Sequence, residues 1–176
     1  MAHHKGPNAS CRRSSGPRRL VVSEKRMAVR QQQRTTAAVP LNERLFRLDG
    51  AGSPVLLGCR CPDCGHHFFP KRAICPGCGH VGLEEAALSS RGKVWSYTVA
   101  HQAPPGAIVQ APYVIAQVEL PEHVLVHTLV TECEPQDVAI GMEVEMTPVR
   151  VGEDDQGRDL VAFAFRPVGA AKRTEP

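Results

Sequence analysis

Cys59 to Gly79 reads CRCPDCGHHFFPKRAICPGCG and holds five of the seven cysteines of this 176-residue chain. Within it the pattern C-P-x-C-G occurs twice, with ten residues between the second and third of its four cysteines. A two-residue spacing lets both thiolates of a pair reach one ion at about 2.3 Å, and the glycine after each pair permits the positive φ of such a turn. We therefore predict a rubredoxin-like zinc ribbon over residues 58–87, with one structural zinc ion bound by Cys61, Cys64, Cys75 and Cys78.

A metal site closed by four sulfurs has no open position for water or substrate, so it cannot act as a Lewis acid in the way that three-ligand sites do. The predicted role of the metal is structural. Iron in a rubredoxin-like site uses similar knuckles and remains the alternative metal. Four further donors lie close in sequence and are expected at the surface or beside the ligands rather than as extra ligands: Cys59, His66, His67 and His80.

The cellular setting follows from what the chain lacks. An odd number of cysteines, their tight pairing and the absence of an apolar secretory-signal core favour metal-bound thiolates over disulfides. No apolar run approaches the roughly 18 residues needed to cross a bilayer. We expect a cytoplasmic protein without membrane contact.

Charge is distributed unevenly along the chain. Residues 1–40 hold nine Lys and Arg against Glu24 alone, whereas residues 88–168 hold five basic against eleven acidic residues. Residues 1–39 also have few large apolar side chains, so they are predicted to be a disordered basic tail, with Met27 as an alternative start. A second flexible tail is expected over residues 169–176.

Residues 40–57 are predicted to form a short docking helix and a lead-in to the ribbon. The helical period places Leu41, Leu45 and Leu48 on one face, and Gly50 is available as a stop. This face either packs on its own domain or docks on a partner.

After the ribbon, apolar residues recur at every second position, which is typical of half-buried strands. Turn signals such as APPGA and GEDDQGR separate five such segments, and no long helix lies between them. A mainly β fold with a five-stranded OB-fold barrel over residues 88–168 is the nearest common solution. The five segments are KVWSYTVAH, PYVIAQVEL, HVLVHTLVT, MEVEMTPV and LVAFAF, with Trp95, Tyr97 and Val99 sharing one face of the first.

No catalytic set is recognisable in the sequence. Cys133 could be a nucleophile, but no general base lies at a recognisable spacing from it. The GAG at 50–52 lacks the rest of a phosphate-binding loop. An OB-fold protein that binds single-stranded nucleic acid is the competing interpretation. It needs a basic groove with exposed aromatic platforms, but the barrel region is acidic and its aromatic residues occupy positions that alternate like a core. We expect no specific nucleic-acid binding.

The motifs together resemble a known family, the zinc-ribbon and OB-fold proteins long labelled a domain of unknown function, which pair with thiolase-like enzymes. The resemblance covers about Leu45 to Val168 and rests on the cysteine stretch, SSRGKVWSYTV, PYVIAQVEL, IGMEVE and FAFRPV. The chain departs from the family pattern at two positions where glycine is usual, Ser90 and His123.

The resemblance implies a non-catalytic subunit that joins a thiolase-like or acyltransferase partner in a hetero-oligomer and helps to shape its acyl-CoA channel. Substrates in such systems include steroid side-chain, aromatic and acetoacetyl-CoA thioesters. Because coenzyme A carries phosphates and a long uncharged arm, a barrel lining its path needs a cation near an uncharged slot. The predicted substrate-binding residues are accordingly Arg91 and Lys93, with the Gln102–Tyr113 loop as the slot wall and Tyr113 at its end.

Overall fold

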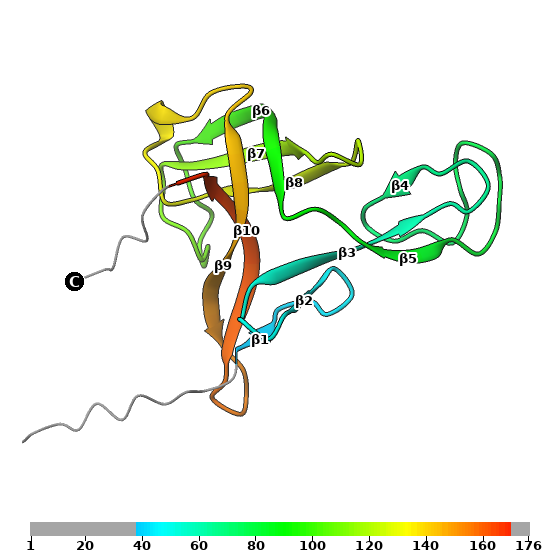
Figure 1. The fold of residues 1–176 in the computed structure, drawn as a ribbon. Coiled ribbons are helices and arrows are strands. Elements are labelled where there is room, and N and C mark those ends of the chain that lie inside the picture. The colour runs from blue at the N-terminus through cyan, green and yellow to red at the C-terminus, as the bar shows by residue number, and fades with distance from the viewer. Residues whose placement is uncertain (1–37, 170–176) are drawn as a thin grey trace, which may run out of the picture. The chain divides into compact units, whose positions relative to one another are not determined.

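The computed structural model describes residues 38–169, and these residues form ten strands and one short 3-10 helix, Pro135–Asp137. The predicted tails over 1–39 and 169–176 lie almost entirely outside the described residues. Figure 1 shows the strands in two groups, a barrel and a ribbon with its lead-in hairpin. No helix among the described residues is long and apolar enough to span a membrane.

The barrel consists of the five predicted strands. Strands β6 (Arg91–Ala100), β7 (Tyr113–Glu119) and β8 (Leu125–Val130) form an antiparallel meander. The long hairpin of β9 (Glu143–Glu153) and β10 (Asp159–Pro167) closes it, because β9 pairs with β6 and β10 pairs with β8 in parallel. A two-residue strand, β1 (Val39–Pro40), adds in parallel to the outer part of β10. The five-stranded barrel is therefore confirmed.

Alternating side chains fill the barrel core as the period of two predicts. On β7, Val114, Ala116 and Val118 are at most 2% exposed, while Gln117 between them faces outward. On β10, Phe165 is fully buried. The core also includes residues from before the barrel, namely Phe46, Leu56 and Leu88.

The predicted helix within 40–57 is wrong. In its place a turn at 43–45 leads into β2 (Phe46–Leu48), which pairs with β3 (Pro54–Arg60). The Asn42 side chain accepts the N–H of Arg44, and this local hydrogen bond favours a turn over a helix. Phe46 then points into the core, 1% exposed, whereas Leu41 is 53% exposed.

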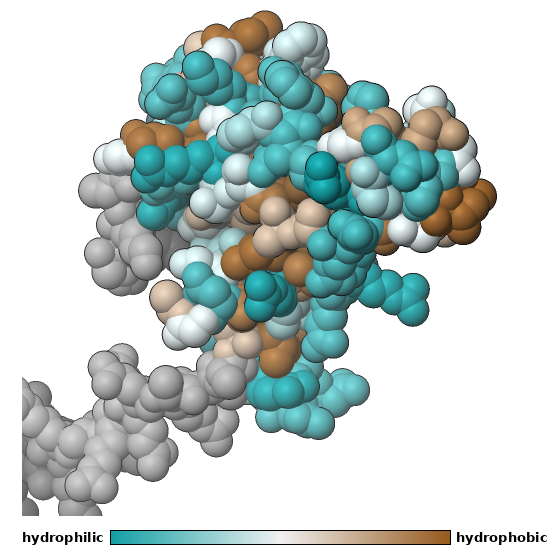
Figure 2. Space-filling model, turned by 45° about the vertical axis from the view of Figure 1, so that its right-hand side comes forward, coloured by the Kyte–Doolittle hydropathy of each residue, from teal (hydrophilic) through white to brown (hydrophobic). Residues whose placement is uncertain are grey.

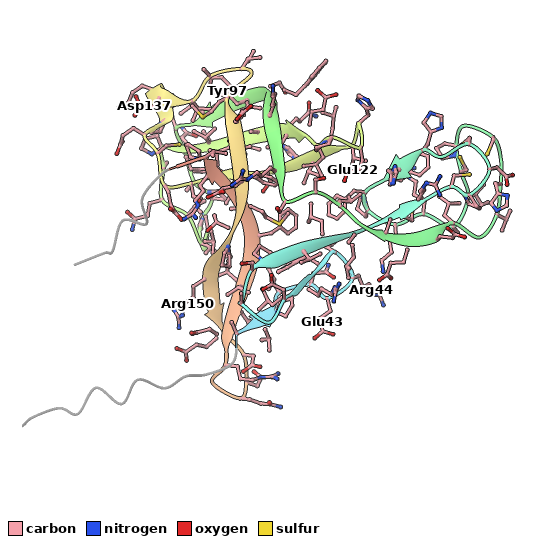
Figure 3. All side chains as sticks on the ribbon, viewed as in Figure 1. Glu43, Arg44, Tyr97, Glu122, Asp137 and Arg150 are labelled. Atoms are coloured by element: carbon pink, nitrogen blue, oxygen red, sulfur yellow. The ribbon has the colours of Figure 1, made fainter. Side chains whose placement is uncertain are left out.

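The expectation that Trp95 and Tyr97 occupy core positions is also wrong, since their side chains are 57% and 40% exposed. The pairing of β6 with β7 shifts between Val94 and Ser96, which makes Trp95 the extra residue of a β-bulge. Val94 is 1% exposed and takes the core position. Figure 3 labels Tyr97 in the upper part of the barrel, where β6 runs.

The ribbon is built on the second half of β3. Strand β4 (His67–Phe68) and strand β5 (Glu84–Ala87) both pair with this half in antiparallel fashion. β3 itself therefore runs across the predicted boundary between residues 57 and 58. At the ribbon exit, the N–H and hydroxyl of Ser89 both donate to Oε1 of Glu122, at 2.9 and 2.7 Å, which ties the exit to a barrel turn (Figure 3).

Candidate metal centre and barrel hollow

Each C-P-x-C-G motif forms a tight turn closed by backbone hydrogen bonds. In the first, the N–H of Gly65 donates to Cys61 O at 3.0 Å, and in the second, the N–H of Gly79 donates to Cys75 O at 2.9 Å. Both glycines have positive φ, 75° and 77°, as such turns require. The two turns are the predicted knuckles.

The structure brings the four predicted ligands together. Among the described residues, the Sγ atoms of Cys61, Cys64, Cys75 and Cys78 form the cluster that could hold a metal ion, all within 4.8 Å of one another. The Cys61–Cys78 and Cys64–Cys75 sulfur distances are 3.6 and 3.5 Å. A tetrahedron with zinc–sulfur bonds of about 2.3 Å has sulfurs about 3.8 Å apart, so the cluster fits a zinc ion. When bound, the zinc ion would cross-link the two knuckles and would take no part in a reaction.

Backbone groups of the knuckles act on the protonation of the thiols. Burial raises the pKa of Cys75, but N–H groups of Cys78 and Gly77 directed at its sulfur, together with hydrogen bonds from the Cys64 and Cys78 side chains, lower it to about 7. For Cys78, the N–H of His80 lowers the pKa, but the hydrogen bond with Cys61 and burial raise it to about 12. Some of the clustered sulfurs are thus held as thiols until a cation replaces their protons.

The neighbouring donors lie beside the ligands. Nδ1 of His66 is 3.1 Å from Cys64 Sγ, and Nδ1 of His80 is 2.7 Å from Asp63 Oδ2. Cys59 is 2% exposed and its sulfur accepts the N–H of Arg72 at 3.2 Å. None of these residues belongs to the four-sulfur group within the described chain.

The three predicted substrate residues do not form one site. Arg91 and Lys93 lie at one end of the β6–β7 pair, where Lys93 is opposite Glu119. Tyr113 is opposite Ala100 at the other end. At about 3.3 Å per residue, six residues of β7 separate the two ends by about 20 Å.

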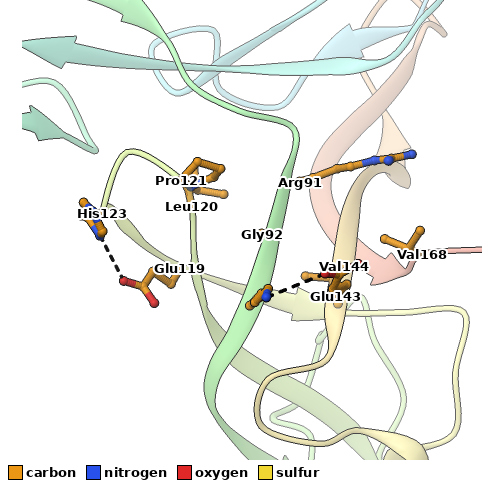
Figure 4. A pocket seen from close by; sticks show the side chains of 10 residues that line it. Arg91, Gly92, Glu119, Leu120, Pro121, His123, Glu143, Val144 and Val168 are labelled. Carbon is orange, nitrogen blue, oxygen red and sulfur yellow. Dashed lines mark hydrogen bonds and ion pairs between the residues drawn. The ribbon is translucent and has the colours of Figure 1, made fainter.

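Arg91 and Lys93 do line a hollow of about 390 Å³ in the barrel wall. Its apolar side chains come from Leu120, Pro121, Val144 and Val168 (Figure 4). Both cations are exposed and paired, Arg91 with Glu145 at 3.2 Å and Lys93 with Glu143 at 3.8 Å.

A backbone feature lies at the edge of this hollow. His123 has a φ of 59°, which lies in the left-handed region that favours glycine. This is one of the two positions, with Ser90, at which the resemblance leads one to expect glycine. Nδ1 of His123 lies 3.5 Å from Glu119 Oε1 (Figure 4), so a polar contact accompanies the unusual conformation.

Exposed apolar side chains are the feature that the sequence did not reveal. Besides Trp95 and Tyr97, the ribbon exposes Ile74 and Val81, at 56% and 69%, and the barrel exposes Ile140 at 71%. Figure 2 shows apolar surface on the ribbon and on the barrel. Only the bulge displaces Trp95, and no local pattern in the sequence indicates it.

Comparisons with known proteins match both parts of the fold. Residues 48–83 match the family described as ChsH2, rubredoxin-like zinc ribbon domain, and residues 85–148 match ChsH2, C-terminal OB-fold domain. A DUF35 domain-containing scaffold protein of Methanocaldococcus jannaschii is 44% identical over 64% of this chain and 82% of its own length. The benzoylsuccinyl-CoA thiolase subunit BbsA of Thauera aromatica is 32% identical over 66% of this chain and 78% of its own.

A solved structure described as Ltp2-ChsH2(DUF35) aldolase gives the corresponding result in three dimensions. Its TM-score to this chain is 0.53 at 33% sequence identity, and the match covers 64% of this chain and 84% of that one. Both the ribbon and the barrel thus have counterparts among characterised proteins.

Proposed function

This chain belongs to the DUF35 family of zinc-ribbon and OB-fold proteins, and on that premise we propose that it is a non-catalytic accessory subunit of a thiolase-like or acyltransferase enzyme. It holds one structural zinc ion, acts in the cytoplasm and forms a hetero-oligomer with the catalytic subunit. Relatives named as a scaffold protein and as a thiolase subunit support this proposal.

The observation that carries the proposal is the closed metal centre. All four corners of the tetrahedron are cysteine sulfurs, so a bound zinc ion keeps no position for a substrate or an activated water. The metal can therefore stabilise the ribbon but cannot do chemistry on a thioester.

Exposed apolar side chains supply a surface that a partner would cover. Trp95 and Tyr97 are of the residue types enriched at the energetic centres of protein interfaces. The exposed Ile74 and Val81 flank the second knuckle, and an isolated β-bridge joins them. Loss of the zinc would disorder this part of the surface, which links the metal to assembly.

Co-expression tests the proposal. The full chain, produced together with a thiolase-like subunit from the same genome, is expected to co-elute with that subunit at a fixed stoichiometry in size-exclusion chromatography. The thiolase-like subunit alone should be less soluble or less active, because part of its apolar surface is uncovered. A subunit that is fully soluble and active alone, and never co-elutes with this chain, contradicts the proposal.

We further propose that Arg91 and Lys93 contact the phosphates of the acyl-CoA substrate in the assembled complex. Their support is the hollow that they border, whose apolar floor suits an uncharged arm. Tyr113 and the Gln102–Tyr113 loop lie at the other end of the β6–β7 pair, and neither lines the hollow, so this proposal does not include them.

Changing Arg91 and Lys93 together to glutamine is expected to raise the KM for acyl-CoA roughly tenfold, about 1.4 kcal/mol, in the assembled complex. Zinc content and assembly should not change, because both side chains are exposed. Arg150→Gln is the control, since Arg150 lies on the long β9–β10 hairpin away from the hollow (Figure 3). An unchanged KM in an assembled double variant would leave this chain as a scaffold alone.

One observation favours single-stranded nucleic-acid binding: Trp95 and Tyr97 are exposed, and bases could stack on them. The acidic excess of residues 88–168 still opposes it, because phosphate contacts require a basic groove. Tight binding of an oligonucleotide by residues 27–176, weakening steeply with salt, would favour this function over the accessory-subunit proposal.

A further inference from the structure

The sequence repeat shared by the two knuckles extends one residue beyond the glycine. The first reads Cys61-Pro-Asp-Cys64-Gly-His66 and the second reads Cys75-Pro-Gly-Cys78-Gly-His80, so each is C-P-x-C-G-H. The two histidines occupy the same position of the repeat, and in each knuckle the histidine carbonyl accepts the N–H of the first cysteine, at 2.9 and 2.8 Å. The backbone thus directs both imidazoles in the same way.

Each imidazole reaches across to the variable position of the other knuckle. His80, from the second knuckle, lies with Nδ1 2.7 Å from Oδ2 of Asp63, the variable residue of the first. This Nδ1–H donates to the carboxylate, and the imidazole side chain is only 29% exposed. The pair therefore connects the two knuckles directly through side chains.

His66 makes the reciprocal approach, but the variable residue that it meets is Gly77. A Cβ built on Gly77 would lie 3.7 Å from Nδ1 of His66, so the imidazole lies directly over this glycine. Because glycine offers no carboxylate, the Nδ1–H of His66 points to the Cys64 sulfur instead, at 3.1 Å. A thiolate bound to a metal can only accept at this contact, which fixes the proton on the nitrogen.

We propose that His66, His80 and Asp63 form a reciprocal histidine crossover that holds the two knuckles together and slows the loss of the metal. The three are positioning residues. His80 and Asp63 restrain the distance between the knuckles, and His66 orients the Cys64 ligand. Hydrogen-bond partners of metal ligands typically change metal affinity by 10–100-fold, and His66 is such a partner because its imidazole bonds to Cys64.

The rate of zinc release from the full-length protein tests the crossover. After zinc loading, an excess of the chromogenic chelator 4-(2-pyridylazo)resorcinol reports the release. His80→Ala and Asp63→Ala are each expected to speed release about two- to fivefold, because their partly exposed pair links the two knuckles without bonding to a ligand. The double variant should release zinc no faster than either single one, since the two residues share one bond.

His66→Ala is expected to speed release about tenfold, because the imidazole of His66 bonds to the sulfur of a ligand. The matched control is His67→Ala, because His67 is adjacent in sequence and has no side-chain hydrogen bond to a ligand among the described residues. His66→Asn and His80→Asn place an amide N–H where Nδ1–H was, so release should return to within about twofold of the original rate. This rescue separates hydrogen bonding from simple loss of packing.

Cobalt substitution distinguishes the two histidines. A hydrogen bond to a thiolate stabilises its lone pairs, so removing it in His66→Ala is expected to move the sulfur-to-cobalt charge-transfer band to longer wavelength. His80→Ala should leave the band in place, because the side chain of His80 bonds to Asp63 and the variant keeps the backbone N–H directed at Cys78. Unchanged release rates in His66→Ala and His80→Ala, with no band shift in the former, would overturn the crossover.

Discussion

Replacing Cys64 with serine is expected to release the metal and unfold the ribbon. The zinc-binding free energy of small zinc-finger peptides is about 10–16 kcal/mol, and it is also their folding free energy. The ribbon has a comparable dependence, because after β3 it contains only a two-residue strand, a four-residue strand and one isolated bridge. Zinc content by mass spectrometry and amide dispersion by NMR measure the loss, and partner binding should disappear with it.

Cys133→Ser is the control for this experiment, since Cys133 lies outside the four-sulfur cluster and packs against the barrel core. It should keep the full zinc content. If Cys64→Ser retains both its zinc and the dispersed signals of the ribbon, the four-cysteine centre is not what stabilises this part of the chain.

Phe46→Ala is expected to lower the free energy of unfolding by about 3–5 kcal/mol, the usual cost of emptying a large aromatic site in a core. Phe46 is 1% exposed and packs edge to face on Phe163, with ring centroids 5.4 Å apart. It is the buried residue of β2 in the barrel core, and Leu48 packs against that core from the same strand. Urea unfolding at saturating zinc measures the change.

Leu41→Ala serves as the matched comparison, because Leu41 is 53% exposed and should change stability by less than about 0.5 kcal/mol. The two variants also separate two structures of residues 40–57. A helix would bury Leu41, whereas the strand buries Phe46. A larger loss for Leu41→Ala than for Phe46→Ala would restore the helix.

The metal ligands and the barrel strands could be predicted because each depends on a short local pattern. Cys61, Cys64, Cys75 and Cys78 are set by spacing within single turns. The strand segments alternate in register with one buried face, as β7 shows most clearly. The chemistry at these positions does not depend on distant residues.

The residues whose positions were predicted wrongly all owe their positions to pairing between segments distant in sequence. Leu41, Leu45 and Leu48 fit a helical period by coincidence, and the Asn42 turn with the β2–β3 pairing replaces it. The exposure of Trp95 follows from a bulge that only the register with β7 defines. Lys93 and Tyr113 were expected to border one slot, but antiparallel pairing places them at opposite ends of the β6–β7 pair.

The ribbon enters and leaves the fold at one point. Gly58 is paired with Ala86 and Arg60 with Glu84, so the chain returns beside the place from which it departed. The order of the barrel strands therefore does not depend on the segment between β3 and β5. A short turn in place of residues 61–83 would leave the barrel threaded as it is, and any surface carried by the ribbon would be lost in the same single step.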